Sequence, residues 1–137
     1  MGYLSRREHS RQELGRKLAT YAEEGDDIDA LLDDFQKRGW LSDERFAEQV
    51  VHARSGRTGS LKVAHELREK GVAESVVKQA VASLDDLESA KSVWQRKFGH
   101  PPGTREEWAK QARFLQSRGF GFDVIKKVLK QDFDADS

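Results

Sequence analysis

A helical pattern that ends in glycine and recurs along the chain is the feature that most constrains its fold. Residues 66–71 (Glu-Leu-Arg-Glu-Lys-Gly) and 114–119 (Phe-Leu-Gln-Ser-Arg-Gly) each contain leucine, two polar residues, a basic residue and glycine, 48 positions apart. The pairs Val76-Val77 and Val124-Ile125 keep the same offset. Residues 35–39 repeat the pattern in a looser alignment. Such a fixed internal period is typical of repeat proteins.

Apolar residues recur every three or four positions along almost the whole chain, which predicts helices rather than strands. Two capping boxes, Ser10 with Glu13 and Thr104 with Glu107, mark helix starts. Other residues suited to begin a helix are Asp27, Ser42, Ser60, Asp85 with Asp86, and Asp123. Helix ends are expected at Gly39, Gly71 and Gly119. The pattern predicts eight helices and no strand.

We therefore predict an all-α fold of tandem three-helix repeats that form a curved, elongated, solenoid-like domain. Repeat one spans residues 1–40, repeat two 41–84 and repeat three 85–131, followed by a disordered tail at 132–137. Because eight helices divide as two, three and three, the first repeat is expected to lack its opening helix, with residues 1–9 as its remnant. The length of 137 residues suits one continuous folding unit.

Charge is abundant and unevenly distributed. Charged residues make up 35% of the chain, against about 25% in an average globular domain, which favours a large exposed surface. The net charge is zero, yet residues 23–34 hold seven acids and no base, and residues 91–118 hold seven bases and two acids. With no cysteine, no apolar signal-peptide core and no long apolar run, the expected location is the cytoplasm, without a membrane anchor.

No group of residues matches a catalytic or metal-binding pattern. The four histidines are neither paired at i, i+4 nor accompanied by cysteine: they are His9, His52, His65 and His100. Residues 56–60 (Gly-Arg-Thr-Gly-Ser) lack the Gly-Lys-Ser/Thr ending of a phosphate-binding loop, and we interpret them as a flexible connection. We predict a protein that binds partners, is not an enzyme, and uses no cofactor and no metal.

Residues 118–122 (Arg-Gly-Phe-Gly-Phe) fit the first half of an RNA-recognition motif whose aromatic side chains project from a strand onto bases. Here the glycine falls at an expected helix end, Asp123 replaces the next apolar strand residue, and no sheet is predicted. We therefore expect Phe120 and Phe122 to pack the turn between the last two helices.

Four blocks of sequence follow one another in the order of a known family. Residues 6–18 contain Arg-Arg-Glu-His-Ser, Glu-Leu and Lys-Leu, and residues 39–47 read Gly-Trp-Leu-Ser-Asp-Glu-Arg-Phe-Ala. Residues 66–72 read Glu-Leu-Arg-Glu-Lys-Gly-Val, and residues 114–120 read Phe-Leu-Gln-Ser-Arg-Gly-Phe. Together these blocks resemble the RecX family of RecA regulators. The family has a further helix before the Arg-Arg-Glu block; if the first repeat is incomplete, a second copy could cover it, so monomer and homodimer both stay open.

The resemblance to RecX implies a non-catalytic protein that binds RecA and lies in the groove of the RecA filament on DNA. It implies negative control of RecA through blocked filament extension or promoted disassembly. RecA's ATP hydrolysis, strand exchange and co-protease function would decrease during recombination and SOS repair. No cofactor is implied, and weak direct binding to DNA stays open.

Two groups of basic residues are the candidates for contact with this partner. The N-terminal group is Arg6, Arg7, Arg11, Arg16 and Lys17, and the C-terminal group is Arg96, Lys97, Arg105, Lys110 and Arg113. Solvated helix faces explain such groups equally well. We interpret Lys70 and Arg118, which stand at helix ends, as complements of the helix dipole.

Two rival functions belong to other classes. One is a direct helix-turn-helix DNA-binding module built from the helices around Gly71, and the other is a helical scaffold with no link to nucleic acid. Specific DNA readers concentrate basic and amide side chains on one recognition helix. Residues 73–84 offer only Lys78 and Gln79, which argues against reading of a DNA groove.

Overall fold

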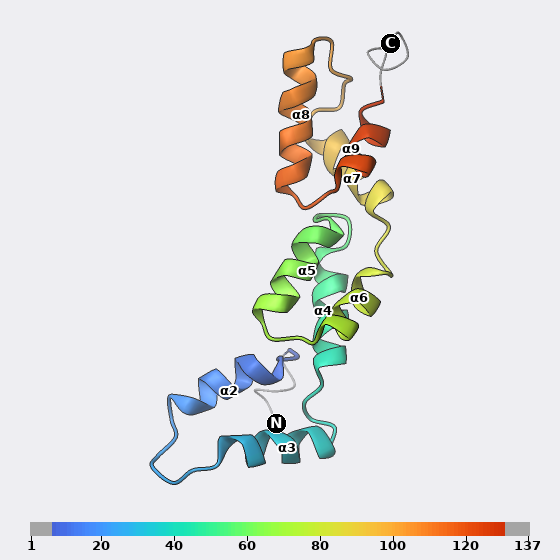
Figure 1. The fold of residues 1–137 in the computed structure, drawn as a ribbon. Helices are drawn as coiled ribbons and strands as arrows, with labels where there is room; N and C mark the ends of the chain where they lie inside the picture. Colours follow the sequence, from blue (N-terminus) through green and yellow to red (C-terminus); the bar gives the residue numbers. More distant parts are fainter. Residues whose placement is uncertain (1–6, 131–137) are drawn as a thin grey trace. The chain divides into compact units, whose positions relative to one another are not determined.

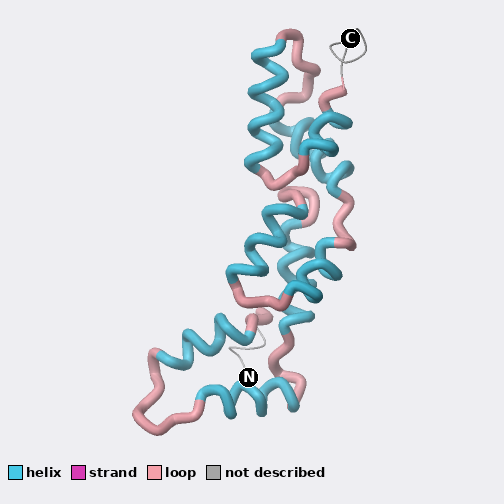
Figure 2. The backbone as a smooth tube through the Cα atoms, viewed as in Figure 1, coloured by secondary structure: helices cyan, strands magenta, loops and turns pink. Residues whose placement is uncertain are grey.

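The computed structural model describes residues 7–130, and this range contains eight α-helices and no strand (Figures 1 and 2). The helices are α2 (Arg11–Ala19), α3 (Ile28–Lys37), α4 (Asp43–Arg54), α5 (Ser60–Glu69), α6 (Glu74–Val81), α7 (Asp86–Lys97), α8 (Arg105–Ser117) and α9 (Phe122–Val128). The all-α prediction is confirmed. The expectations for the first six residues and for the tail at 132–137 lie outside the described residues.

Most helices begin where the sequence indicates. At α2 the Glu13 amide donates to Ser10 Oγ at 3.1 Å and the Ser10 amide donates to Glu13 Oε1 at 3.3 Å, which completes the expected capping box. The side chains of Asp27 and Asp85 cap α3 and α7 by accepting from the amide three residues on. These caps satisfy backbone donors that a helix start leaves without an intrahelical partner.

One predicted helix start is confirmed without its full capping box, and another is wrong by one residue. Thr104 accepts from the Glu107 amide as expected, but the Glu107 carboxylate accepts from the Gly103 amide at 2.9 Å, so the second capping box is only half formed. Helix α9 begins at Phe122, one residue before Asp123, which therefore lies in the first turn and not at the cap. A carboxylate in the first turn still interacts favourably with the helix dipole, which is why the sequence alone did not separate the two positions.

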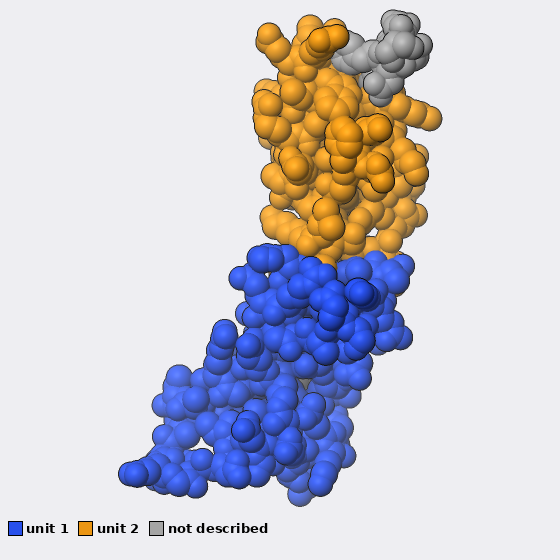
Figure 3. Space-filling view, viewed as in Figure 1, with its two compact units in different colours: residues 1–52, 65–82 blue, residues 53–64, 83–137 orange. Residues whose placement is uncertain are grey.

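The described helices belong to two compact units, coloured separately in Figure 3. Unit 1 comprises residues 1–52 and 65–82, and unit 2 comprises residues 53–64 and 83–137. The division falls within α4 and α5, so it does not follow the expected repeat boundaries. Those boundaries, the single folding unit and the curved form stay predictions.

Each unit has its own apolar cluster. In unit 1, α2 and α3 bury Leu14 and Leu32 together with Leu41 in the following turn. In unit 2, α7, α8 and α9 contact one another around a larger cluster, which consists of Ala90, Val93, Leu115, Phe120, Ile125 and Leu129. The buried positions are those of the three- and four-residue apolar spacing, as expected for amphipathic helices.

The N-terminus of α2 is bound by the chain that follows it, at what we call the first junction (Arg11, Gln12, Asp43 and Gly71). The Arg11 amide, at the first position of α2, donates to Asp43 Oδ1 at 2.8 Å, and Asp43 is the first residue of α4. Gln12 packs so closely on Gly71 that a Cβ at Gly71 would lie 2.8 Å from the Gln12 Cβ. An amide without an intrahelical partner is thereby satisfied by a distant carboxylate.

The second junction (Gly59, Ser60, Lys62, Asp86 and Gly119) repeats this arrangement in unit 2. The Ser60 amide, at the first position of α5, donates to Asp86 Oδ1 at 3.0 Å, and Asp86 is the first residue of α7. The Gly59 amide donates to the Arg118 carbonyl oxygen at 2.7 Å, and the Leu61 amide donates to the Gly119 carbonyl oxygen at 3.2 Å. Two backbone segments are therefore hydrogen-bonded directly to each other.

This arrangement corrects the expectation for residues 56–60. The segment was expected to be a flexible connection, but the Gly56 amide donates to Ser89 Oγ at 3.2 Å and the Gly56 carbonyl accepts from Arg96 at 2.8 Å. The amides of Gly59 and Ser60 are bonded as well. Partners from distant parts of the chain fix this glycine-rich loop, and local sequence does not reveal them.

The junctions also correct the alignment of the glycines. Gly71 and Gly119 follow α5 and α8, which are the middle helices of the sets α4–α6 and α7–α9. Gly39 follows α3, which is the last helix before the set α4–α6 begins. All three have positive φ, so all three end helices as expected, but Gly39 does not occupy the position of the other two. The looser third alignment was wrong because any helix that ends in a left-handed residue favours glycine.

We predict that Gly119→Val destabilises the protein more than Gly25→Val. Both glycines have positive φ (90° and 95°), a conformation that costs a β-branched residue about 1–2 kcal/mol. A Cβ at Gly119 would also overlap the Lys62 Cβ, whereas nothing lies within 4 Å of one at Gly25. The added overpacking should cost a further ~1–3 kcal/mol.

Urea unfolding of the two variants and the wild type, followed by far-ultraviolet circular dichroism, measures the difference. Equal losses of unfolding free energy in the two variants would show that the second junction adapts to a side chain.

Candidate partner-binding surface

Most of the N-terminal basic group is engaged within unit 1. Arg6 lies outside the described residues. Arg7 forms an ion pair with Glu13 at 2.6 Å, and Arg11 forms one with Asp33 at 2.7 Å. Arg11 also lies 3.8 Å from Asp29, so its guanidinium joins α2 to α3. The acidic run at residues 23–34 thus neutralises a cation that the sequence suggested for partner contact.

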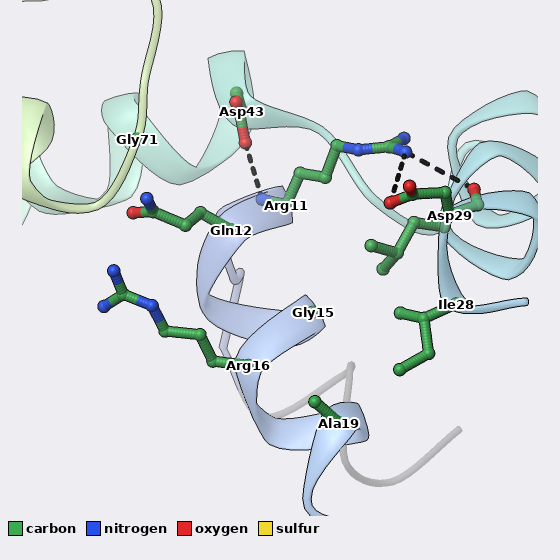
Figure 4. Close-up of a pocket in the computed structure, with 10 residues that line it drawn as sticks. Arg11, Gln12, Gly15, Arg16, Ala19, Ile28, Asp29, Asp43 and Gly71 are labelled. Atoms are coloured by element: carbon green, nitrogen blue, oxygen red, sulfur yellow. Dashed lines mark hydrogen bonds and ion pairs between the residues drawn. The ribbon is translucent and has the colours of Figure 1, made fainter. Parts of the chain in front are cut away.

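Arg16 differs from Arg7 and Arg11. Its side chain is exposed and has no ion-pair or hydrogen-bond partner among the described residues, and it lines an open groove of about 450 Å³ beside α2. Figure 4 shows Arg11 directed toward Asp29, with Arg16 directed to the opposite side of α2. Lys17 is also exposed and has contacts of its own. Arg16 is therefore the clearest free cation of this group.

Glu13 joins three parts of unit 1. Besides its cap hydrogen bond it accepts from Arg7 at 2.6 Å and lies 3.6 Å from Lys70 Nζ. Burial raises the pKa of Glu13, but the hydrogen bond and charge of Arg7, with the Ser10 amide and Lys70, outweigh burial and leave that pKa lowered. Lys70 therefore has a specific carboxylate partner in addition to any interaction with the helix dipole.

His9 is a buried polar residue next to this carboxylate, with 3% of its surface exposed. Desolvation and the nearby charge of Arg7 lower the pKa of His9 below its ordinary value of 6.5, although Glu13 acts in the opposite direction. The neutral imidazole is consequently the form that the folded unit favours.

In the C-terminal group, two residues have structural contacts. Arg96 on α7 donates to the Gly56 carbonyl oxygen at 2.8 Å, and Lys97 Nζ lies 5.3 Å from the centroid of the Phe114 ring. Arg118 lies over the same ring at 5.1 Å. These cation–π distances are within the range in which a ring attracts a cation. Arg96 and Lys97 therefore support unit 2 whether or not they contact a partner.

The three basic residues on α8 are different. Arg105, Lys110 and Arg113 are exposed, and none has an ion-pair or hydrogen-bond partner within residues 7–130. Exposed cations without carboxylate partners leave a positive potential that attracts an oppositely charged surface. The structure thus separates the nine described candidates into engaged and free cations, with most of the free ones on α8.

Phe122 was expected to pack in the turn before α9, and this expectation is wrong. Phe120 is buried with 1% of its surface exposed, but Phe122 is 62% exposed. Its ring contacts Trp108 edge-on, with 6.4 Å between centroids, and Lys126 Nζ lies 5.3 Å from its centroid. A large aromatic side chain left in water is an informative departure from ordinary burial.

The sequence did not reveal the junction residues Asp43, Asp86 and Gly59. Asp43 and Asp86 each stand at the first position of a helix, where an acid is expected for local reasons. The available signal was that α4 and α7 both begin with aspartate at matching places in successive helix sets. The described part of the chain is thus a helical repeat protein with two equivalent junctions and three cations on α8 that have no partner within it.

Comparison with known proteins places this repeat architecture in a family. The family model for the second three-helix domain of RecX matches residues 42–81, and the model for the third three-helix domain matches residues 84–129. These ranges contain α4–α6 and α7–α9.

Curated relatives agree with these matches. The regulatory protein RecX of Ralstonia pickettii is 44% identical over 131 residues, which cover 94% of this chain and 82% of the relative. RecX of Ralstonia nicotianae is 45% identical over 95% of this chain and 83% of its own length. RecX of Neisseria gonorrhoeae is 37% identical over 98% and 88%. The chain belongs to the RecX family of regulatory proteins.

Solved structures share the fold. The crystal structure of RecX from Lactobacillus salivarius has a TM-score of 0.79 at 20% sequence identity and covers 98% of this chain and 91% of its own. A second crystal structure of a regulatory protein RecX also has a TM-score of 0.79, at 20% identity, and covers 95% of this chain and 68% of its own. At this identity the likeness shows the fold alone, which is the tandem three-helix architecture.

Within residues 7–130, no helix is long and apolar enough to cross a membrane. The same part of the chain contains no group of three or more His, Cys, Asp or Glu side chains arranged to hold a metal ion.

We predict that unfolding free energy decreases as the pH falls from neutral. The pKa of His9 is lowered in the folded protein, so His9 in the unfolded chain takes up a proton first as the pH falls through 6.5. The contribution of His9 to the unfolding free energy is lost from that pH downward. Glu13 acts at lower pH: its contribution is present above its ordinary value of 4.5 and is lost as the pH falls through the lowered folded value.

Urea unfolding at pH 7.5 and 5.5, with a His9→Gln variant as the control, tests the contribution of His9. The variant should show a smaller decrease than the wild type. A nuclear magnetic resonance titration that gave His9 a pKa at or above 6.5 would contradict the prediction.

Proposed function

We propose that this protein binds RecA and its filaments on DNA and negatively modulates RecA activity in recombination and SOS repair. Membership of a family of regulatory proteins supports a regulatory role, and the sequence blocks that resemble RecX support RecA as its target. In this proposal the protein is not an enzyme, needs no cofactor and acts in the cytoplasm. It limits filament extension, ATP hydrolysis, strand exchange and the co-protease function.

The observation that carries the proposal is the set of unpaired cations on α8. Arg105, Lys110 and Arg113 have no carboxylate partner in the described part of the chain, whereas Arg7 and Arg11 are neutralised by acids of unit 1. The DNA in a RecA filament carries the negative charge of its phosphates. Complementary charge of this kind increases the association rate and selects partners.

The rival function is direct DNA reading by α5 and α6. The base of this helix pair is fixed by Arg68, which pairs with Glu74 through two contacts of 2.8 Å. That hydrogen bonding raises the pKa of Arg68, and Glu74 places a negative charge directly beside its guanidinium. Lys78 and Gln79 remain exposed on α6, which is a small set for specific base contacts. Binding to naked DNA is therefore the control and not the main proposal.

We predict that reversal of Arg105, Lys110 and Arg113 to Glu weakens inhibition of RecA's DNA-dependent ATP hydrolysis by at least about tenfold, more so at low salt. The matched control reverses Lys37, Lys78 and Lys91, three exposed lysines on other helices, and changes the net charge equally. Melting curves should barely change, because exposed charges contribute less than ~1 kcal/mol each.

The wild type, the α8 variant and the control are compared in the same assay with naked DNA binding measured in parallel. Equal inhibition by the α8 variant and the control would show that RecA contacts another face, and Arg16 with Lys17 would be reversed next. A wild type that bound naked DNA with sequence preference and left RecA unaffected would support the rival function.

A further inference from the structure

An apolar groove of about 230 Å³ lies between α8 and α9 in unit 2. Methyl groups and aromatic rings form most of its lining: Trp108, Ala109, Ala112, Phe122 and Ile125. Gln116 and Arg113 complete it, and Arg113 is the single charged residue among the described lining residues. Cofactor and drug-sized ligand pockets usually measure about 300–1,000 Å³. This groove suits one or two side chains and not a cofactor.

The groove is open at Phe122. This ring is 62% exposed although the adjacent Phe120 and Ile125 are almost fully buried. Exposed aromatic groups at the edge of an apolar depression are typical of an interaction site, because docking of an apolar side chain removes both surfaces from water.

Charge around the groove is mainly positive. Arg113 lines it, and Lys126 Nζ lies 5.3 Å from the centroid of the Phe122 ring, which is itself part of the lining. The acids of these two helices lie in their first turns, where they complement the helix dipoles: they are Glu106, Glu107 and Asp123. A ligand that carries carboxylates beside an apolar group would match this surface.

We propose that the α8–α9 groove binds a segment of a protein partner in which one bulky apolar side chain is flanked by aspartate or glutamate. The inference rests on the proposed function, since that partner is the protein whose filament the chain regulates. The apolar side chain fills the groove against Trp108, Ala112 and Phe122, and the flanking carboxylates interact with Arg113 and Lys126. Single-stranded nucleic acid fits less well, because it requires a continuous track of cations along several stacking rings.

The direct test uses the full chain and a synthetic peptide with the central sequence Asp-Asp-Phe-Asp-Asp, labelled for fluorescence polarisation. Replacement of the peptide's Phe by Ala should abolish measurable binding. On the protein, Phe122→Ala and Arg113→Glu should each weaken binding by about tenfold, which corresponds to ~1.4 kcal/mol. The nuclear magnetic resonance signal of the Trp108 indole should shift on titration with the peptide, because the Trp108 ring contacts Phe122.

Matched controls come from the same unit. Leu61 is an exposed apolar residue with 61% of its surface exposed, and Lys91 is an exposed cation on α7; neither lines the groove. Leu61→Ala and Lys91→Glu should leave peptide affinity within about twofold. Equal loss in the controls, or binding that survives both groove substitutions, would overturn the proposal.

Two other occupants are distinguished by the same measurements. Residues 132–134 of this chain read Asp-Phe-Asp. If Phe133→Ala in the free chain shifts the Trp108 indole signal as much as the peptide does, the chain's own tail is the occupant. A Trp108 shift that depends on protein concentration without peptide would identify a second copy. Either result would overturn a partner segment as the occupant.

Inhibition of RecA separates this proposal from the proposed function. If Phe122→Ala inhibits RecA as strongly as the wild type while the α8 reversal variant does not, the groove proposal is wrong and the proposed function stands. If the wild type fails to inhibit RecA, the proposed function is wrong, and peptide binding still decides whether the groove has the stated chemistry.

Discussion

The arrangement within each unit depends on how the N-terminus of one helix is bound by the helix set that follows. The first amides of α2 and α5 point out of their helices and have no intrahelical acceptor. Asp43 and Asp86 accept from them, and each aspartate stands at the first position of its own helix as well. One carboxylate therefore serves two helix N-termini, which couples their positions through short, charge-assisted hydrogen bonds. Glycine then allows the close approach of the neighbouring turn, most clearly where Gly59 contacts Gly119 backbone to backbone.

These junctions explain why some features were predictable and others were not. Capping by Ser10, Asp27 and Asp85 depends on residues three positions away, so local sequence was sufficient. The all-α class and the apolar clusters follow from three- and four-residue spacing for the same reason. The fixed loop at residues 56–60 depends on Ser89, Arg96 and Arg118, which are 33 or more positions away in sequence. No local pattern encodes such partners.

The candidate partner-binding surface also has features that local sequence predicts and features that only contacts between distant residues determine. A basic cluster in sequence contains both neutralised and free cations, and only tertiary contacts separate them. Arg11 forms an ion pair with Asp33 on α3 at 2.7 Å. Arg113 has no such neighbour among the described residues. The net charge of zero does not show this difference, because it does not tell which cations have an acid beside them, as Arg11 has Asp29 and Asp33. Arg105, Lys110 and Arg113 on α8 have no ion-pair partner among the described residues.

Phe120 and Phe122 differ in what they contribute to the stability of unit 2. The two residues flank Gly121, and both were expected to stabilise the same turn, yet one is buried in the α7–α9 cluster and the other is mostly in water. The stability of unit 2 accounts for the position of Phe120, since burial of this side chain removes a large apolar surface from solvent. It does not account for Phe122, whose exposed ring contributes little apolar burial to unit 2. Phe122 instead lines the apolar groove together with Arg113, and its exposed ring is the surface that the proposed partner segment would cover.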